Sequence, residues 1–461
     1  MKLRLPGKVQ RIINVLYQHG YEAYAVGGCV RDSVLMREPH DWDITTSATP
    51  EQVKELFDKT LDTGLEHGTV TIMIGREGFE VTTYRIDGEY LDGRHPKEVV
   101  FTPKLEEDLK RRDFTINAMA YSEHDGLVDR FGGMMDLQNR IIRCVGNPEE
   151  RFSEDALRML RAVRFSAQLG FSIDEDTRQA IKKLAPALKK ISAERIQAEL
   201  IKLLTSNHPE YFQEAYELGI TKVILPEFDV CMECEQKNPH HMYTVGEHLI
   251  KSMTFIKRDK ALRFTMLLHD IGKPKMKTTD EAGVDHFHKH ASASCLMAEE
   301  ILKRLKFDND TIRTVTTLVR WHDYHPEPKA PQVRKLIHKV GQEYFPLLME
   351  VQRADLLAQS GYQLEEKARN WERVGLTFDH ILNEEQCISL KQLAVNGKDL
   401  IDLGMKPGKK VGETLEMLLN MVLEYPQCNT KMYLVAYVQE HVLSPDLPTD
   451  KAEGEIESKT E

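Results

Sequence analysis

The alternation of apolar and polar residues divides the chain into two kinds of region. The first part contains short apolar, β-branched runs bounded by glycine, at 24–28, 69–75 and 79–85. From Arg151 onward, apolar residues recur with the period of amphipathic helices, as at 194–204, 260–272 and 298–307. The pattern predicts an α+β fold, in which a small mixed sheet at 1–145 is followed by an all-helical remainder.

Proline-rich breaks divide the helical remainder further. They lie near Pro226 and Pro239, and again from Pro326 to Pro331. We expect helical units at 146–228, 229–360 and 361–443. The last segment, 444–461, is poor in apolar residues and is predicted to be disordered.

The charge balance limits the partners that the surface can bind. Lys and Arg number 62 against 73 Asp and Glu, a net charge of -11, so any contact with RNA must use local basic patches. No apolar run is long enough to cross a bilayer, which predicts a cytoplasmic protein without a membrane partner. The seven cysteines suit reduced thiols, and the lone CxxC of Cys231 and Cys234 is interpreted as plain thiols rather than a metal site.

The segment YAVGGCVRDSVLMREPHDWDI carries the first candidate chemistry. Gly28 lies in a turn where backbone N–H groups can approach a phosphate, and Arg31 lies in the first turn of the helix that follows. Asp41 and Asp43 flank Trp42, so on an extended strand both carboxylates face one side, as a magnesium site requires. An isolated Gly-Gly turn or Asp-x-Asp is more often a plain loop, and the combination favours a site. Glu80 is a weak candidate for a third carboxylate.

Together with EEDLKRRDFTINAMAY, these motifs resemble the class II tRNA nucleotidyltransferases, which include bacterial CCA-adding enzymes and poly(A) polymerases. The resemblance implies a head similar to DNA polymerase beta, with Mg²⁺ held by Asp41 and Asp43. It also implies phosphate binding by Gly28 and Arg31, and recognition of ribose and triphosphate by the RRD motif. That motif matches at Arg111, Arg112 and Asp113, and its alternative reading is a surface charge run.

Two later motifs extend the resemblance. The segment at 128–146 matches a DxxGGxxDL motif with Asp129, Gly132, Gly133, Asp136 and Leu137, which implies a hinge between head and neck. SAERIQAEL, with Glu194, Arg195 and Glu199, resembles a motif that braces a helix turn, and we assign it a structural role. The matched parts are the catalytic head at 1–145 and a nucleobase- and RNA-binding neck at 146–228.

In EDALRMLRAVRF, four polar residues recur every third position and are expected to form one helical stripe: Asp155, Arg158, Arg161 and Arg164. On a solvated helix, Glu154 would simply pair with Arg158. The family's EDxxR motif implies instead that Asp155 and Arg158 read the incoming base. Cytosine and adenine each offer an amine donor beside a ring-nitrogen acceptor, which suits a carboxylate and an arginine, whereas uracil and guanine offer the reverse.

A second constellation lies in the unit at 229–360. His269 and Asp270 follow an apolar helical run, and His248 and Asp355 approach from other segments, which is the pattern of the HD superfamily. A transition metal is expected there, and His290 and His322 are candidates for a second metal or for phosphate binding. Hydrolysis of phosphates and support of the tRNA body both remain open. The unit at 361–443 is expected to bind tRNA.

The sequence favours template-independent CCA addition from CTP and ATP to the tRNA 3′ end. TIMIGREGFEV lacks the GRRF-type element usual in poly(A) polymerases, and YRIDGEYLDGRHPKEVVFTP keeps the loop that CC-only enzymes lose. Addition of A alone stays open. The intact DWDI, RRD and EDALR motifs argue against an HD phosphohydrolase with a head that only binds RNA.

Overall fold

The computed structural model describes residues 2–87 and 99–443 and separates into two compact units. One unit contains residues 1–320 with 357–360, and the other contains 321–356 with 361–461. The finer division predicted from the sequence stays a prediction. The expected disorder of 444–461, and most of the loop on which intact A addition depends, lie outside the described residues.

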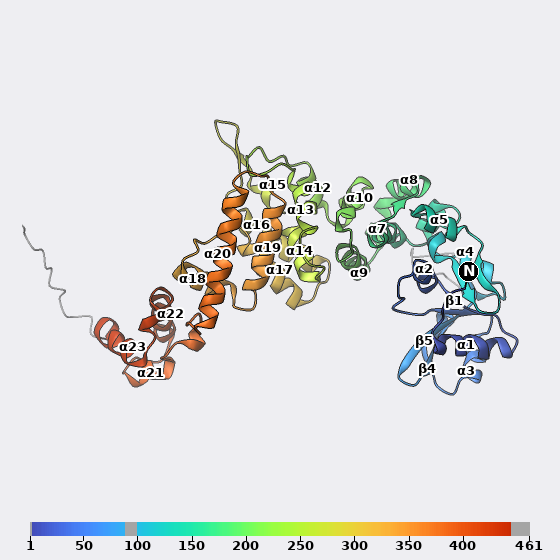
Figure 1. Ribbon diagram of the computed structural model, residues 1–461, viewed down its shortest axis with the longest axis horizontal. Coiled ribbons are helices and arrows are strands. Elements are labelled where there is room, and N and C mark those ends of the chain that lie inside the picture. Colours follow the sequence, from blue (N-terminus) through green and yellow to red (C-terminus); the bar gives the residue numbers. More distant parts are fainter. Residues whose placement is uncertain (1, 88–98, 444–461) are drawn as a thin grey trace, which may run out of the picture. The chain divides into compact units, whose positions relative to one another are not determined.

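A seven-stranded sheet forms the centre of the N-terminal head (Figure 1), in the order β3-β4-β5-β2-β1-β8-β9. Its strands are β1 (Ala23–Val26), β2 (Ile44–Thr46), β3 (Thr60–Gly64), β4 (Thr69–Ile74), β5 (Glu77–Thr83), β8 (Met119–Ser122) and β9 (Gly126–Asp129). Within this seven-stranded sheet, the β2–β5 pair is parallel and the other pairs are antiparallel. A separate antiparallel pair joins β6 (Arg85–Asp87) to β7 (Val99–Phe101). The predicted small mixed sheet is confirmed.

Short helices surround this sheet: α1 (Gly7–Gln18), α2 (Gly28–Val34), α3 (Pro50–Leu56), α4 (Leu105–Lys110) and α5 (Gly133–Asn139). The apolar face of α1, with Val9, Ile12 and Leu16, is buried, and α1 packs on β1 and α3. Because α2 begins directly after β1, the chain turns sharply at the end of the central strand. The predicted turn followed by a helix is confirmed.

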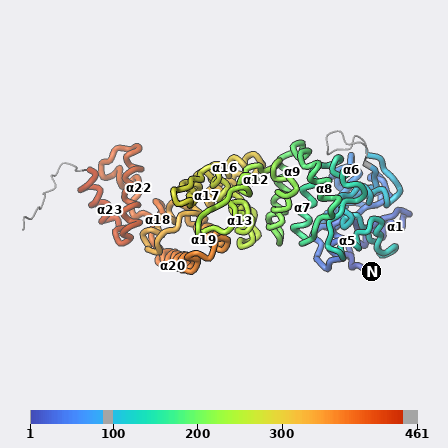
Figure 2. Tube along the Cα trace, turned by 90° about the horizontal axis from the view of Figure 1, so that it is seen from above, coloured from blue at the N-terminus to red at the C-terminus, as the bar shows by residue number. Residues whose placement is uncertain are grey.

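The rest of the first unit is mostly helical. The neck comprises α6 (Pro148–Glu154), α7 (Leu157–Leu169), α8 (Glu175–Leu184), α9 (Ala193–Leu204), α10 (Phe212–Glu217), α11 (Thr221–Ile224) and α12 (Pro226–Met232). In it, α7 packs against α9 and α6 against α8 (Figure 2). Further along are α13 (Val245–Met253), α14 (Lys260–Leu268), α15 (Lys273–Met276), α16 (His290–Arg304) and α17 (Asn309–Trp321).

The sequence pattern missed three two-residue strands beyond residue 145. β10 (Ile141–Ile142) pairs in parallel with β11 (Ser172–Ile173), and β12 (Thr278–Thr279) pairs with β13 (Asp285–His286). Strands of two residues are too short for an alternation of apolar and polar residues, so no pattern in the sequence predicts them.

The second unit is entirely helical among its described residues: α18 (Ala330–Val340), α19 (Phe345–Leu357), α20 (Leu364–Asn383), α21 (Gly397–Asp402), α22 (Lys409–Glu424) and α23 (Lys431–Val438). Its C-terminal core gathers side chains of α21, α22 and α23 that are almost fully buried, among them Leu400, Leu418 and Leu434. No helix in the described ranges of either unit has the length and apolarity that a membrane span needs.

The predicted start of one helix was wrong. The sequence predicted that Asp155 and Arg158 share a helix, but α6 ends at Glu154 and α7 begins at Leu157. Asp155 takes an extended conformation between them, and its Oδ1 accepts a hydrogen bond from the Leu157 N–H at 3.0 Å. A short acidic side chain that caps a helix competes with helix continuation, which explains the break.

Candidate functional site

The turn between β1 and α2 is built around Gly27. Its φ of 80° lies in the left-handed region, and its N–H donates to the Met119 carbonyl at 3.1 Å. A Cβ at Gly27 would lie 3.0 Å from Nη1 of Arg112, so a side chain there would require that guanidinium to shift by a few tenths of an ångström. The absence of a side chain therefore lets Arg112 approach the turn, where Gly28 begins α2.

Asp41 and Asp43 lie in the irregular segment directly before β2, and both residues are exposed. The Val26 N–H donates to the Asp43 carbonyl at 3.0 Å, which fixes the acidic pair beside the Gly27 turn. Desolvation of its carboxyl raises the pKa of Asp43. The charge of Arg112 lowers this pKa and that of Asp41 raises it. Two carboxylates whose charges interact suit a hard divalent cation.

Glu80 lies on the neighbouring strand. β2 and β5 pair in parallel with Ile44 opposite Val81, so the same register continued by one residue puts Glu80 level with Asp43. Glu80 is exposed. Paired residues on adjacent strands project to the same face of a sheet, which favours Glu80 as a third carboxylate. This role remains a prediction.

In the RRD segment, the aspartate faces the neck. Asp113 Oδ2 accepts from Nη2 and Nε of Arg161 at 2.6 and 2.9 Å, and Oδ1 accepts from Asn117 at 3.1 Å. Burial alone would raise the pKa of Asp113, but the charge of Arg161 and these hydrogen bonds hold it well below its usual range. Asp113 is therefore an ionised anchor between head and neck.

The two arginines of the segment share a carboxylate that the sequence analysis overlooked. Asp108, fully buried within α4, accepts from Arg111 at 2.7 and 2.9 Å and from Arg112 at 3.4 Å.

Arg31 is held by neighbours in the head. Its Nε and Nη2 each donate to Asp32 at 2.9 Å, and its Nη1 donates to Asn117 at 2.7 Å. Its guanidinium carbon also lies 5.1 Å from the centre of the Phe165 ring. Asp32 neutralises much of its charge, so the expected binding of phosphate by Arg31 remains a prediction.

The residues expected to read the base are engaged in ion pairs. Arg158 Nη1 donates to Glu154 at 2.6 Å, which is the pair expected for a solvated helix. Its Nη2 donates to the Arg111 carbonyl at 3.0 Å. Asp155 Oδ2 accepts from Arg195 at 2.7 Å. The sequence assigned Arg195 only to a bracing motif, and the structure brings it to one of the predicted base-reading residues.

The other two arginines of the expected stripe turn inward. Arg161 holds Asp113, and Arg164 donates to Glu199 Oε2 at 2.7 Å. The Arg164 guanidinium lies 3.6 Å from the centre of the Phe165 ring. These contacts link α7 to the head and to α9, and direct nucleotide binding by Arg161 and Arg164 remains a prediction.

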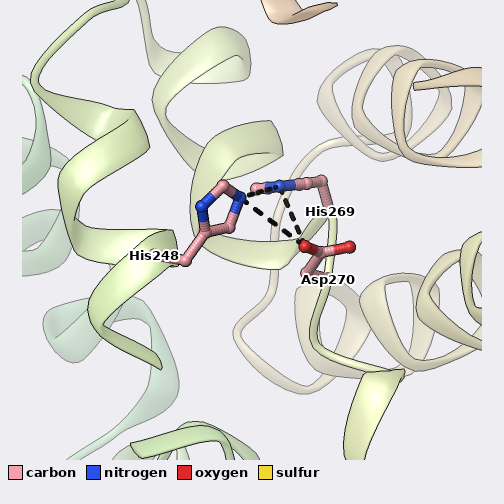
Figure 3. Close-up of side chains that lie close together, drawn as sticks. All are labelled: His248, His269 and Asp270. Atoms are coloured by element: carbon pink, nitrogen blue, oxygen red, sulfur yellow. Dashed lines mark hydrogen bonds and ion pairs between the residues drawn. The ribbon is translucent and has the colours of Figure 1, made fainter. Parts of the chain in front are cut away.

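A second cluster lies among α13, α14 and α15 (Figure 3). His248 and His269 have their Nε2 atoms 3.2 Å apart, and Asp270 Oδ2 lies 3.6 and 3.4 Å from them. Ligands about 2.1 Å from one ion, at angles of about 90–120°, are separated by about 3.0–3.6 Å. The three side chains are almost completely buried, and their spacing fits a single metal ion.

Backbone carbonyls fix the protonation of these rings. Nδ1 of His269 faces the Met266 carbonyl at 2.9 Å, and Nδ1 of His248 faces the Ala358 carbonyl at 3.3 Å. A carbonyl only accepts, so Nδ1 of each ring carries a proton, and in the neutral ring Nε2 is then the nitrogen that can bind a metal. This is the form in which a histidine binds a metal.

Further polar groups surround Asp270. Lys273 Nζ lies 2.7 Å from its Oδ2, and His290 Nε2 lies 3.2 Å from its Oδ1. Asp355 is buried on α19 and His322 follows α17, both in the second unit, and their part in the metal site remains a prediction. Cys231 is buried and Cys234 half-buried, and desolvation raises the pKa of both thiols, which favours plain thiols.

The sheet order, the acidic pair beside a glycine turn and the arginines above it define a nucleotidyltransferase head. Comparison with known proteins agrees, since residues 23–143 match the poly A polymerase head domain and residues 170–232 match the RNA- and SrmB-binding site of polymerase A. Residues 279–438 match the second domain of tRNA nucleotidyltransferases.

Similar proteins narrow the class further. The CCA-adding enzyme of Lactobacillus helveticus is 36% identical over 438 residues, covering 94% of this chain and 96% of that protein. That of Streptococcus pyogenes is 34% identical over 455 residues, covering 96% and 100%. The solved structure of the Bacillus stearothermophilus CCA-adding enzyme in complex with CTP has a TM-score of 0.72 at 31% identity, covering 96% of this chain and 99% of that one. The chain belongs to the CCA-adding enzyme family of tRNA nucleotidyltransferases.

Proposed function

We propose that this protein adds C, C and A in turn to the 3′ end of tRNA from CTP and ATP, and releases pyrophosphate. The observation that carries the proposal is the tie between the acidic pair and the Gly27 turn, through the 3.0 Å bond from Val26 to Asp43, with Arg112 directed at the same turn. This arrangement brings metal ligands and phosphate ligands together. The predicted division into head (1–145), neck (146–228), metal-binding unit (229–360) and tRNA-binding unit (361–443) is part of the proposal.

In this proposal Asp41 and Asp43 hold Mg²⁺, assisted by Glu80. Mg²⁺ bound by these carboxylates would lower the pKa of the 3′-hydroxyl and would offset charge on the leaving pyrophosphate. Gly28 donates its backbone N–H to the triphosphate, and Arg112 supplies a fixed positive charge. Arg31 and Asp113, which both lie in the head, support the triphosphate and ribose of the nucleotide.

Base choice is assigned to Asp155 and Arg158. Arg158 is bound to the carbonyl of Arg111, which couples the base-reading residue directly to the RRD segment. A carboxylate facing the exocyclic amine and an arginine facing the ring nitrogen satisfy both cytosine and adenine. Uracil and guanine would leave both protein groups opposite like partners, which costs about 1–3 kcal/mol for each contact in a dry pocket.

The direct test is incubation of the pure protein with tRNAs that end before CCA, after C and after CC. Full CCA addition predicts that all three substrates are completed with CTP and ATP and that extension then stops. Extension of the CC-ended substrate alone would identify an A-adding enzyme. Long A tails would identify a poly(A) polymerase. Because tRNA and nucleotides are the substrates, we place the reaction in the cytoplasm.

A second function is favoured by the His248, His269 and Asp270 cluster. We propose that this cluster binds one transition metal ion and can support hydrolysis of a phosphate ester, with His290 at its edge. Equilibrium titration of chelator-treated protein with Ni²⁺, Co²⁺ and Zn²⁺ should show one tight site. Absence of binding by all three ions would remove this second function and leave nucleotide addition as the sole proposal.

A further inference from the structure

Asp108 is a fully buried carboxylate that is bonded to two arginines. It lies within α4, where Arg111 donates two hydrogen bonds to its Oδ1 and Arg112 donates one to its Oδ2. Burial raises the pKa of Asp108, but the charges of both arginines more than offset this and hold it below its usual value. The carboxylate therefore stays ionised when the head is folded.

Asp108 does not use all the hydrogen-bond donors of Arg112. One carboxylate faces two guanidinium groups, and its bond to Arg112, at 3.4 Å, is long. Nε of Arg112 is buried and has no hydrogen-bond partner among the described residues, and Nη1 of the same side chain points at the Gly27 turn. A guanidinium with spare donors beside a glycine turn is suited to an anion with several oxygens, such as a triphosphate.

Asp108 also connects these arginines to the strand that follows the acidic pair. Thr45 Oγ1 on β2 donates to Asp108 Oδ2 at 3.2 Å, and Thr45 is two residues beyond Asp43. Residues two apart on a strand face the same side of the sheet. Asp108 thus fixes the position of Arg112 relative to Asp43, across a gap of more than sixty residues in the sequence.

We propose that Asp108 is a positioning residue, which holds Arg111 and Arg112 against β2 so that Arg112 meets the triphosphate of CTP and ATP at the Gly27 turn. This inference rests on the proposed nucleotide addition. Asp108 itself touches neither metal nor nucleotide. Its effect should therefore appear in the binding of phosphates and leave the choice of base and the metal requirement unchanged.

The test is Asp108→Asn, which keeps the shape and removes the charge. Steady-state addition to tRNA lacking CCA should show a KM for CTP and for ATP raised by about tenfold or more, with kcat within about threefold of wild type. Inhibition by pyrophosphate, which has neither base nor sugar, should weaken by the same factor. Glu106→Gln removes an exposed charge from the same helix and should change none of these values.

The outcomes separate the possibilities. A fall in kcat with unchanged KM, or a shift of the Mg²⁺ half-saturation in place of the pyrophosphate effect, would overturn the positioning role. If Asp108→Asn does not fold, Thr45→Val, which removes one bond to the same carboxylate, should raise both nucleotide KM values by about two- to threefold. Unchanged values in folded Thr45→Val would then overturn the proposal. An inactive wild type would instead refute nucleotide addition itself.

Discussion

The two candidate metal sites of this chain are built in opposite ways. In the head, Asp41 and Asp43 are exposed, precede a short strand and have one adjacent arginine. In the second site, His248, His269 and Asp270 are buried, and backbone carbonyls face Nδ1 of both rings. An open carboxylate pair suits an ion that arrives and leaves with a charged substrate, whereas an enclosed set with fixed lone pairs suits a resident ion. We infer that the sites differ in metal exchange as well as in chemistry.

The strongest test of this contrast is Asp41→Ala or Asp43→Ala. Loss of either carboxylate should lower nucleotide addition by about a thousandfold or more, because metal activation of the 3′-hydroxyl is lost. Single-turnover addition measures the effect, and circular dichroism should show an unchanged fold. Asp58→Ala, an exposed aspartate elsewhere in the head, is the matched control. Near-normal turnover in either site variant would remove the acidic pair from the mechanism.

A second, smaller effect concerns the choice of nucleotide at the site in the head. In the double variant Asp155→Asn and Arg158→Gln, the first side chain gains an N–H donor where wild type only accepts, and the second gains a carbonyl acceptor where wild type only donates. Preference for CTP and ATP over UTP and GTP should fall by roughly a hundredfold, since two polar contacts are mispaired. The measurement is single-turnover addition of each nucleotide to CC-ended tRNA. Lys182→Gln on α8 serves as a surface control, and an unchanged preference with a uniformly slower rate would contradict base reading.

Metal binding at the buried cluster should be independent of nucleotide addition in the head. His269→Ala with Asp270→Ala is expected to abolish tight binding of Ni²⁺, Co²⁺ or Zn²⁺ and any phosphatase activity, because the ligands are lost. Addition of CMP and AMP should stay within about threefold of wild type. Metal content by mass spectrometry, followed by addition assays, decides this, with His288→Ala as the control. Loss of both activities in a folded variant would mean that the two sites are coupled.

The smallest predicted effect concerns acid stability of the hairpin β12–β13. Burial would raise the pKa of Asp285, but hydrogen bonds from Lys277 and the Lys237 N–H lower it to about 2. This carboxylate therefore contributes stability that is present above about pH 4 and is lost as the pH falls through about 2. Melting temperatures of wild type and Asp285→Asn should differ at pH 6 and converge near pH 2. A constant difference would contradict this linkage.

The sequence predicted the motifs better than it predicted their partners. The glycine turn and the sheet of the head were foreseen, because turns and strands leave local patterns. The start of α7 was wrong, since the capping bond of Asp155 competes with helix continuation at a single residue. The bond from Arg195 to Asp155 and the arginine pair on Asp108 were missed. Such pairings depend on which surfaces meet after folding, and spacing along the chain carries no trace of them.

The parallel pair β10–β11 has a consequence for recombining parts of such proteins. Ile141 and Ile142 belong to the segment that ends the head, whereas Ser172 and Ile173 follow α7 in the neck. A hybrid that exchanges residues 1–145 between relatives would join one half of this ladder to a foreign second half. Crossover points placed after residue 174 would keep the ladder and the Asp113–Arg161 bond within a single parent. Hybrids of this second design should be recovered folded more often.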